Sequence, residues 1–420
     1  MRQKHNVRIE LFCAGATIAT SAPRPARTRV KPLAPSRPPT QPLRPSPAPM
    51  QPMPTPVQPQ LPLAQVQLQG QEPRAGSAGL PSVAIVSTTA QSSLKVLEQW
   101  IGYHRAVGVQ HFYLFLEMGA MTLAPKLREL PGVAVWVLDE EHERTLNTFI
   151  SKNESFLRPF LGKPCSWALM LRQNYNVDIA IEKAFSMGLD WLVHVDTDEL
   201  LYPGGSPDYS MRQVLGNVGE NTTFVVFPNY EALPETDGIV DPFSEVTLFK
   251  KARDHTSPEA RKKYARNSKM GNPGYFLLYM NGKSAARLVP GIRASGVHRF
   301  FLPQKSLRKS LRRKAVVEKH SEAAVLHFTY TRFADMTSKA GMCNCPLDEQ
   351  SLKTCFVLEF DRQVYVQLHS PEKNDTVLRE WYRQRVVWDH TKPIKATNIK
   401  YGLFQRIFAP QTIIRCLLTR

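Results

Sequence analysis

The stretch "WLVHVDTDELL", Trp191–Leu201, places three carboxylates directly after a run of apolar, strand-forming residues. The carboxylates belong to Asp196, Asp198 and Glu199. A buried carboxylate is costly unless it is paired with a cation or bound to a metal. The stretch therefore predicts a buried strand that ends in a functional carboxylate cluster.

The spacing of Asp196 and Asp198 favours a hard divalent cation, Mn²⁺ or Mg²⁺, which prefers oxygen ligands. A phosphatase of the D-x-D-x-T type would need Thr or Val where Leu200 stands. An EF-hand would need Gly at the sixth position, which is Leu201. Carboxylates that only cap a turn or a helix remain the alternative without a ligand.

Short apolar runs alternate with helical patterns on the amino-terminal side of this stretch. Strands are expected at 83–88 ("VAIVST"), 111–117 ("HFYLFLE"), 133–139 ("VAVWVLD") and 190–196, and helices at 92–109 and 165–189. This β-α-β rhythm predicts an α/β fold whose mainly parallel sheet is covered by helices on both faces. Ligands of such sheets bind beyond the carboxyl ends of the strands, and Asp196 stands at one of those ends. After 201 the strand-like pieces are joined by longer connections, which predicts a more irregular half that binds an acceptor.

The first 79 residues differ in composition from the rest. Segment 1–22 is basic and weakly apolar, which fits a poor signal sequence, a signal anchor or an organelle transit peptide. Segment 23–79 is rich in proline and is expected to form a disordered stalk. The net charge of +18 suggests polyanions, but the sequence holds no nucleic-acid-binding module, so we expect no nucleic-acid partner. The basic run at 305–320 reads as a solvated helix face or as a surface for phosphates, acidic glycans or lipid headgroups.

Three of the six cysteines lie close together in "CNCPLDEQSLKTC", at Cys343, Cys345 and Cys355. In an oxidising compartment this spacing predicts a local disulfide staple. A zinc site is the alternative, although zinc sites usually use C-x-x-C spacing.

Several stretches carry a family resemblance. The D-x-D that ends a strand after a β-α-β-α half is the pattern of GT-A-type glycosyltransferases. "LEQWIGYHRAVGVQHFYLF" is similar to the opening of glycosyltransferase family 92, and "DWLVHVDTDELLYP" resembles its metal motif. "GNPGYFLLYMNGKSAARL" and "EAAVLHFTYTRFADMTS" resemble the plant KOBITO-type glycosyltransferase-like proteins, and the resemblance spans roughly 82 to 415.

The resemblance implies that 80–420 forms a GT-A glycosyltransferase-like domain in the secretory pathway, at the Golgi or the plasma membrane. A type II arrangement would use the N-terminal segment for membrane association. The expected activity is transfer of a hexose from a nucleotide sugar, of the UDP type, to a glycan or cell-wall polysaccharide, linked to cell elongation and cellulose deposition. The alternative is a transferase-like regulator of cell-wall synthesis or growth signalling that catalyses little.

A metal-dependent transferase needs ligands for its Mn²⁺ or Mg²⁺ ion, which neutralises the leaving diphosphate. Asp198 is the expected direct ligand, and Asp196 is expected to act through water or to hold the ribose. A further ligand is expected from His298 or His327, late in the chain. For each histidine, a satisfied position in the core is the alternative.

The donor nucleotide needs additional contacts. Lys283 is the expected diphosphate clamp because a lysine point charge suits phosphate. Arg172 and Gln173 precede the metal strand on a helix, and Thr88 ends the first strand, so all three are expected to reach the nucleotide.

An inverting transferase also needs a carboxylate that takes the proton of the acceptor hydroxyl. Glu231, Asp241 and Glu245 lie in the appropriate half of the chain, and an acidic surface loop is the alternative for each. Glu231 directly follows a predicted strand and ranks first, ahead of Asp241.

Overall fold

The computed structural model describes residues 79–89, 92–152, 162–262, 281–302, 315–341, 343–389 and 394–418. The predictions for segments 1–22 and 23–78, and for most of the basic run at 305–320, lie outside these residues. All of the following concerns the described part.

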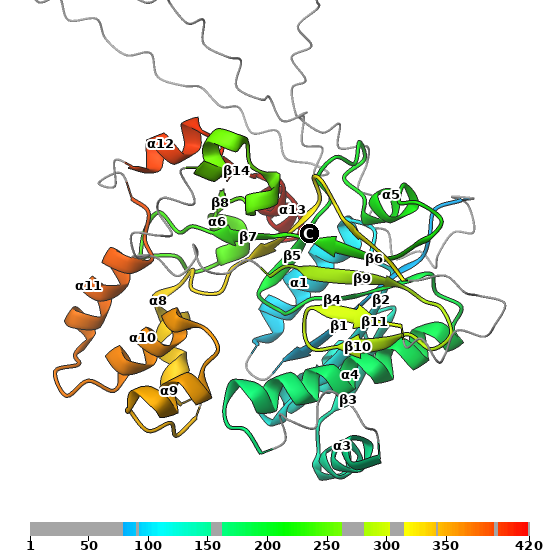
Figure 1. Cartoon of the computed structure of the whole chain (residues 1–420), viewed down its shortest axis with the longest axis horizontal. Helices are drawn as coiled ribbons and strands as arrows, with labels where there is room; N and C mark the ends of the chain where they lie inside the picture. Colours follow the sequence, from blue (N-terminus) through cyan, green and yellow to red (C-terminus); the bar gives the residue numbers. More distant parts are fainter. Residues whose placement is uncertain are drawn as a thin grey trace, which may run out of the picture. The chain divides into compact units, whose positions relative to one another are not determined.

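A seven-stranded sheet forms the centre of this part (Figure 1). Its strands, in spatial order, are β12 (Val316–Lys319), β6 (Thr222–Phe227), β9 (Lys283–Arg287), β4 (Trp191–His194), β1 (Val83–Thr89), β2 (His111–Leu116) and β3 (Val133–Val137). Strand β9 runs antiparallel to both neighbours, and the other pairs are parallel. The predicted mainly parallel α/β architecture of the GT-A type is confirmed.

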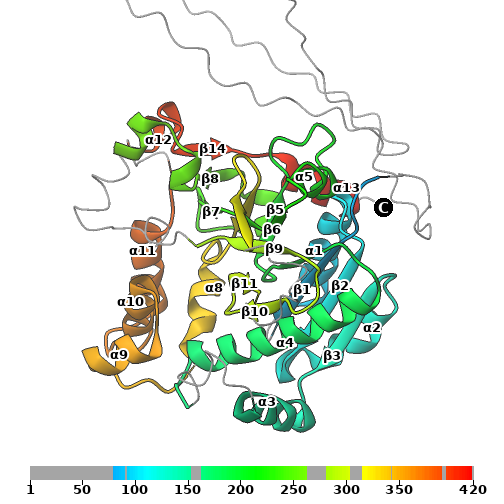
Figure 2. The ribbon, with the colours of Figure 1, turned by 45° about the vertical axis from the view of Figure 1, so that its right-hand side comes forward.

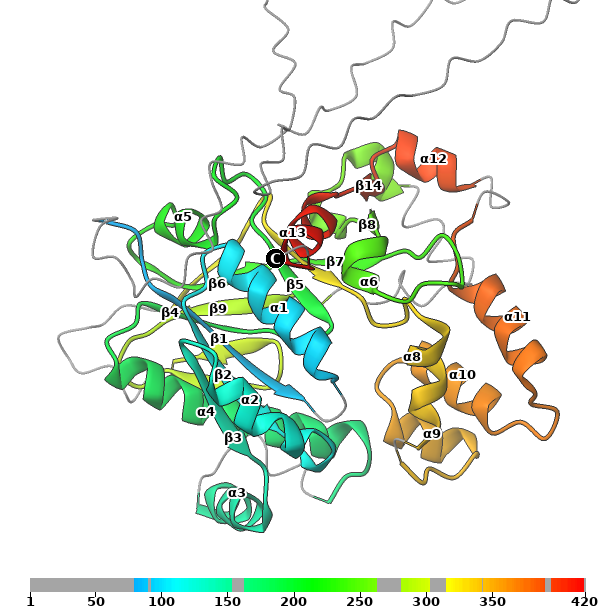
Figure 3. The same cartoon turned by 180° about the vertical axis from the view of Figure 1, so that it is seen from behind.

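Helices cover both faces of this sheet (Figures 1 and 3). Helix α4 (Ser166–Ser186) lies on one face, and α1 (Leu94–Ala106) and α2 (Ala124–Arg128) lie on the other. Strand β1 is apolar at consecutive positions because its alternate side chains feed two cores: Val83 and Ile85 pack with α1, while Ala84 and Val86 pack with α4.

A second, five-stranded sheet continues from the carboxylate stretch. Its spatial order is β14 (Phe404–Arg406), β8 (Leu248–Lys250), β7 (Asn229–Ala232), β13 (Ala324–His327) and β5 (Glu199–Tyr202). Because β4 belongs to the first sheet and β5 to the second, the turn that contains Asp196 and Asp198 joins the two sheets.

The remaining elements surround these sheets. Helices α8 (Phe333–Thr337), α9 (Glu349–Cys355), α10 (Glu359–Leu368) and α11 (Asp375–Arg385) gather beside the second sheet (Figure 2). Of these, α8, α10 and α11 share an apolar core with Leu248 and Phe404, whereas α9 packs in a separate apolar cluster with Tyr365 of α10. The others are η1 (Met118–Leu123), α3 (Glu140–Lys152), α5 (Met211–Gly216), α6 (Pro242–Glu245), η3 (Arg253–His255), β10 (Arg293–Ser295), β11 (Arg299–Phe301), η6 (Ser338–Gly341), α12 (Ile394–Lys400) and α13 (Ala409–Leu418). Among the described helices, none combines the length and the apolar character needed to span a bilayer.

Two disulfides tie the cysteine-rich segment. Cys345 pairs with Cys355 inside the predicted cluster, and Cys343 pairs with Cys165 at the start of α4, 178 residues away. The sequence predicted the local staple but not the partner on α4. The Cys165–Cys343 bond links the segment before α9 to the start of α4, which covers one face of the seven-stranded sheet.

Candidate active site

Hydrogen bonds from Glu199, which follows the turn, and from Trp100 of α1 hold the turn Asp196-Thr197-Asp198. The Glu199 side chain accepts a hydrogen bond from the Asp196 backbone N–H at 2.9 Å, which supports the turn. From α1, the Trp100 indole N–H donates to the carbonyls of Asp196 (3.1 Å) and Glu199 (2.8 Å). The turn is therefore fixed before any ligand binds.

Two further α1 side chains hold the strand that follows the turn. The Tyr103 hydroxyl donates to the Leu201 carbonyl at 2.9 Å, and His104 Nε2 accepts from the Leu201 N–H at 3.2 Å. The opposite nitrogen, His104 Nδ1, donates to the Trp100 carbonyl. These contacts explain the W-x-x-Y-H pattern of α1. Trp100, Tyr103 and His104 stand at positions i, i+3 and i+4, so they share one helix face and all three form hydrogen bonds to the backbone of β5.

Asp196 accepts hydrogen bonds from two protein donors. Its Oδ2 accepts from Lys283 Nζ at 2.6 Å, and its Oδ1 accepts from Gln173 Nε2 at 3.0 Å. Burial alone would raise the pKa of the Asp196 carboxyl, but the charge and hydrogen bond of Lys283, together with smaller contributions from His194 and His298, outweigh burial and keep that pKa below its usual range.

Lys283 itself is buried within this cluster. Its Nζ also donates to the Val297 carbonyl at 3.1 Å and lies 3.5 Å from Glu199 Oε2, and its side chain has no exposed surface. An ammonium group has three protons to donate, and these three partners account for them. Lys283 thus faces Asp196 and Glu199, and its expected role as a diphosphate clamp stays a prediction.

His194 is a member of the cluster that sequence reasoning missed. It is buried, its Nδ1 donates to the Val297 carbonyl at 2.9 Å, and its Nε2 lies 3.7 Å from Asp196 Oδ1. Burial lowers the pKa of this imidazole to about 4, so it is neutral at pH 7. His194 ends β4 and Asp196 lies two residues beyond it, and this spacing of two was the available signal.

Asp198 has a different environment. Its side chain is 47% exposed, and its Oδ2 lies 3.8 Å from His327 Nε2. The other ring nitrogen, His327 Nδ1, donates to Glu231 Oε1 at 2.7 Å. Burial alone would lower the pKa of His327, but the charge and hydrogen bond of Glu231, together with the charges of Asp198 and Glu199, outweigh burial and raise that pKa to about 10.

Asp198 Oδ2 and His327 Nε2, which lie 3.8 Å apart, would be the protein ligands of a hard divalent ion bound here, and the imidazole would release its Nε2 proton on binding it. In the described part of the chain, the only His, Cys, Asp or Glu trio with ligand atoms within 4.8 Å of one another is formed by cysteines. An ion at Asp198 would therefore take few protein ligands and complete its shell with water and phosphate, as Mg²⁺ usually does.

The other predicted site residues lie around this centre at greater distance. Thr88 is buried at the end of β1 and accepts a hydrogen bond from Asn176 of α4. Arg172 forms an ion pair with Glu117 at 2.8 Å, at the end of β2. His298 Nδ1 donates to the Gly282 carbonyl at 3.1 Å, so this nitrogen faces the β9 connection.

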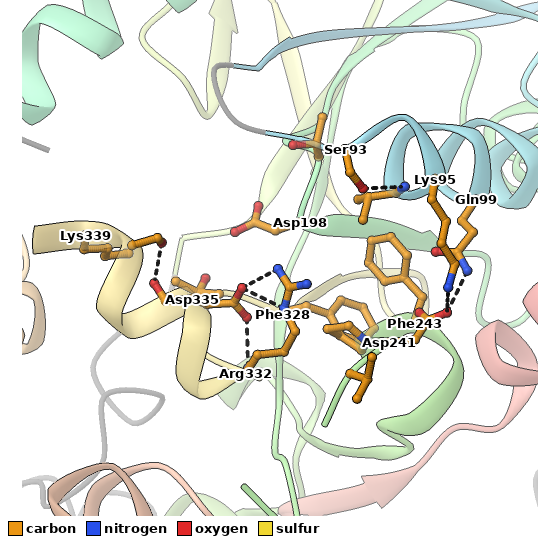
Figure 4. Close-up of a pocket in the computed structure, with 16 residues that line it drawn as sticks. Ser93, Lys95, Gln99, Asp198, Asp241, Phe243, Phe328, Arg332, Asp335 and Lys339 are labelled. Carbon is orange, nitrogen blue, oxygen red and sulfur yellow. Dashed lines mark hydrogen bonds and ion pairs between the residues drawn. The ribbon is translucent and has the colours of Figure 1, made fainter. Parts of the chain in front are cut away.

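A pocket of about 390 Å³ opens beside Asp198 (Figure 4). Its wall includes Asp241, which accepts from Gln99 Nε2 at 2.7 Å, and two cations that the sequence did not single out, Arg332 and Lys339. Glu231 does not reach this pocket, because it has no exposed surface and its Oε1 also accepts from Asn229 at 2.5 Å. The structure therefore brings Asp198 and Asp241 to one cavity and places Glu231 behind His327.

Two relatives from Arabidopsis thaliana resemble the chain over 332 residues. "Glycosyltransferase-like At3g57200" is 39% identical, and "Glycosyltransferase-like At2g41451" is 37% identical. Each alignment covers 79% of this chain, and they cover 62% and 71% of the respective relative. The chain belongs to this glycosyltransferase-like family. It spans less than two thirds of the length of the first relative.

Other comparisons add little. No protein-family model matches the chain. HddC from Yersinia pseudotuberculosis is 9% identical with a TM-score of 0.25, covering 62% of this chain and 97% of that one. The 4-diphosphocytidyl-2C-methyl-D-erythritol synthase from Anaerococcus prevotii is 12% identical with a TM-score of 0.21, covering 38% and 60%. Scores this low support no argument about function.

Proposed function

We propose that the domain is a metal-dependent glycosyltransferase that moves a hexose from a UDP-type nucleotide sugar to a glycan acceptor. The observation that carries this proposal is the position of Asp198, the carboxylate of the turn that lines the pocket. Membership of a glycosyltransferase-like family supports the reaction class.

In the proposed reaction, Asp198 and His327 hold a Mn²⁺ or Mg²⁺ ion. When bound, this ion supplies the Lewis acidity that stabilises a diphosphate leaving group. Asp196 keeps its contact with Lys283 and acts on the ion or the ribose through water. Thr88, Arg172 and Gln173 are the residues proposed to contact the nucleotide.

Asp241 is the proposed general base, ahead of Glu231. It lies in the pocket wall with Asp198, whereas Glu231 has no exposed surface. Asp241 takes the proton of the acceptor hydroxyl while that oxygen forms a bond to the anomeric carbon. The bond from this carbon to the diphosphate oxygen breaks at the same time, so the configuration of the sugar inverts.

The resemblance to KOBITO-type proteins suggests a cell-wall polysaccharide as acceptor and a role in cell elongation and cellulose deposition. A secretory compartment, the Golgi or the plasma membrane, is consistent with two disulfides, because disulfides persist in oxidising environments. Membrane association would come from the N-terminal segment.

Calorimetry of UDP binding, with Mn²⁺ and then with EDTA, tests the proposal. We expect tight binding only with Mn²⁺, and a loss of tenfold or more in Asp198→Asn, because this change removes a ligand charge and keeps the side-chain shape. The control is Asp254→Asn, the same change at an exposed ion pair with Lys319 outside the pocket. Equal binding in EDTA would overturn the metal dependence.

Turnover is a separate question from binding. A panel of UDP-sugars incubated with Mn²⁺ should release UDP, and release should be lost in Asp241→Asn. A wild-type protein that binds UDP with Mn²⁺ but releases none from any donor or acceptor would favour the alternative of a weakly catalytic regulator of cell-wall synthesis.

A further inference from the structure

Four charged residues form a row across the second sheet. Glu199 on β5 pairs with His327 on β13, His327 pairs with Glu231 on β7, and Glu231 pairs with Lys250 on β8. Directly paired residues on adjacent strands point to the same face of a sheet. Glu199, Glu231 and Lys250 are each at most 1% exposed, and charged side chains are almost never buried to this extent unless they are paired.

Glu231 is the centre of this row. Its Oε1 accepts from His327 Nδ1 at 2.7 Å and from Asn229 Nδ2 at 2.5 Å. Lys250 stands opposite it on the other neighbouring strand, so a buried cation flanks the carboxylate on the side away from His327. With no exposed surface, Glu231 has no route to a sugar hydroxyl. Its contacts are those of a side chain that orients another.

His327 transmits this contact to the pocket. A carboxylate that holds the proton on Nδ1 leaves Nε2 as the outward-facing nitrogen and fixes the plane of the ring. His327 Nε2 lies 3.8 Å from Asp198 Oδ2 and contacts the Thr329 hydroxyl, and both Asp198 and Thr329 line the pocket. The row therefore ends at the position where the proposed ion would bind.

We propose that Glu231 is a positioning residue for the metal site: it holds His327 Nδ1 so that Nε2 faces Asp198, while Lys250 flanks Glu231 from the next strand. The ion in this inference rests on the proposed function, whereas the contact between Glu231 and His327 does not. The other candidate histidine, His298, is oriented by a backbone carbonyl, that of Gly282.

The test is Glu231→Gln, which keeps the shape and removes the charge. Mn²⁺ affinity in the presence of UDP is measured by calorimetry, and we expect it to fall ten- to a hundredfold, as losses of groups that orient metal ligands usually cause. The control is Glu235→Gln. Glu235 is also a partnered carboxylate near β7, but its partners are Lys395 and Arg406, so Mn²⁺ affinity should be unchanged.

A second readout does not depend on the ion. In protein labelled with ¹⁵N-histidine, the proton on His327 Nδ1 should give a downfield signal, assigned by its absence in His327→Asn. In Glu231→Gln the neutral amide oxygen is a weaker acceptor than the carboxylate, so we expect the signal to move upfield. If Glu231→Gln folds poorly, Glu231→Gln/Lys250→Met removes both buried charges and should restore folding while His327 still faces a neutral acceptor.

The outcomes separate the two proposals. Wild-type Mn²⁺ affinity in Glu231→Gln, or a His327 signal at its wild-type position in that variant, would overturn the positioning role. If the wild-type protein binds no Mn²⁺ at all, the proposed function fails, and the signal alone then decides whether Glu231 positions His327.

Discussion

Replacing Lys283 with methionine tests the electrostatic centre of the site. Methionine is similar in length and apolar, so Lys283→Met removes the charge and little volume. The change leaves the Asp196 and Glu199 carboxylates without the ammonium group that now lies 2.6 and 3.5 Å away. Removing one partner of a buried ion pair typically costs about 3–5 kcal/mol, because the other charge stays buried and uncompensated. We expect a loss of that size at pH 8.

The loss should depend on pH. Burial raises the pKa of Glu199 to about 7 even with Lys283 nearby, so its folded-state pKa is above the unfolded value of 4.5. The stability associated with a neutral Glu199 is therefore fully present below pH 4.5 and is lost as the pH rises through 7. Without Lys283 the pKa of Glu199 should rise further. Lys283→Met should consequently be less harmful at pH 5.5 than at pH 8.

Urea denaturation of the wild type, Lys283→Met, Glu199→Gln and the double variant provides the measurement. The double variant replaces Glu199, one of the two carboxylates left without a cation, by a neutral amide. This variant should therefore be more stable than Lys283→Met alone, with a coupling energy of roughly 1–3 kcal/mol between the two positions. A diphosphate clamp would give a different result: a small change in stability and a large loss of UDP affinity. If Lys283→Met unfolds at the same urea concentration as the wild type at pH 8, the assignment of Lys283 to Asp196 and Glu199 is wrong.

Two other predictions concern stability. Burial lowers the pKa of His104 to about 3, so the folded protein keeps this imidazole neutral while the unfolded chain takes up a proton below pH 6.5. Stability should therefore fall on acidification, and the slope measured by urea denaturation between pH 6.5 and 4 should be shallower in His104→Gln by up to about 1.4 kcal/mol per pH unit; an unchanged slope would refute this. Removing the Cys165–Cys343 disulfide by double alanine substitution should cost more than removing Cys345–Cys355, about 5 against about 3 kcal/mol in the chain-entropy view, because the closed loops differ in length, 178 against 10 residues. Equal urea midpoints of the two double variants would contradict the pairing.

The parallel half of the fold was readable because its signals are local. The apolar run at Val83–Thr89 and the helical pattern now seen at Ser166–Ser186 can each be recognised without knowing what they contact. Strand β5 was not predicted. Its residues, Glu199–Tyr202, look like the end of a carboxylate loop, and they become a strand only by pairing with β13, more than a hundred residues later.

The site divides in the same way. The Asp196–Asp198 pair could be found from spacing, because both carboxylates follow one strand. The role of Glu231 could not, because it depends on the parallel pairing of β7 with β13, which sets Glu231 beside His327 across 96 residues of sequence. The position of Glu231 in the sequence suggested a general base on the acceptor side. The register between β7 and β13 instead makes Glu231 the hydrogen-bond partner of His327.

Compensation of charge explains, residue by residue, why three carboxylates follow a buried strand. Asp196 and Glu199 share the buried ammonium of Lys283, and Glu231, further along, is held by His327. Among the described residues, the ion pair of Asp198 is with His327, at 3.8 Å, and that imidazole is already engaged by Glu231. Asp198 is also the most exposed of the four, at 47% against 29% or less for the others. The carboxylate whose charge the protein compensates least is thus the one that faces the pocket, which is the arrangement expected of a group whose cation arrives with the substrate.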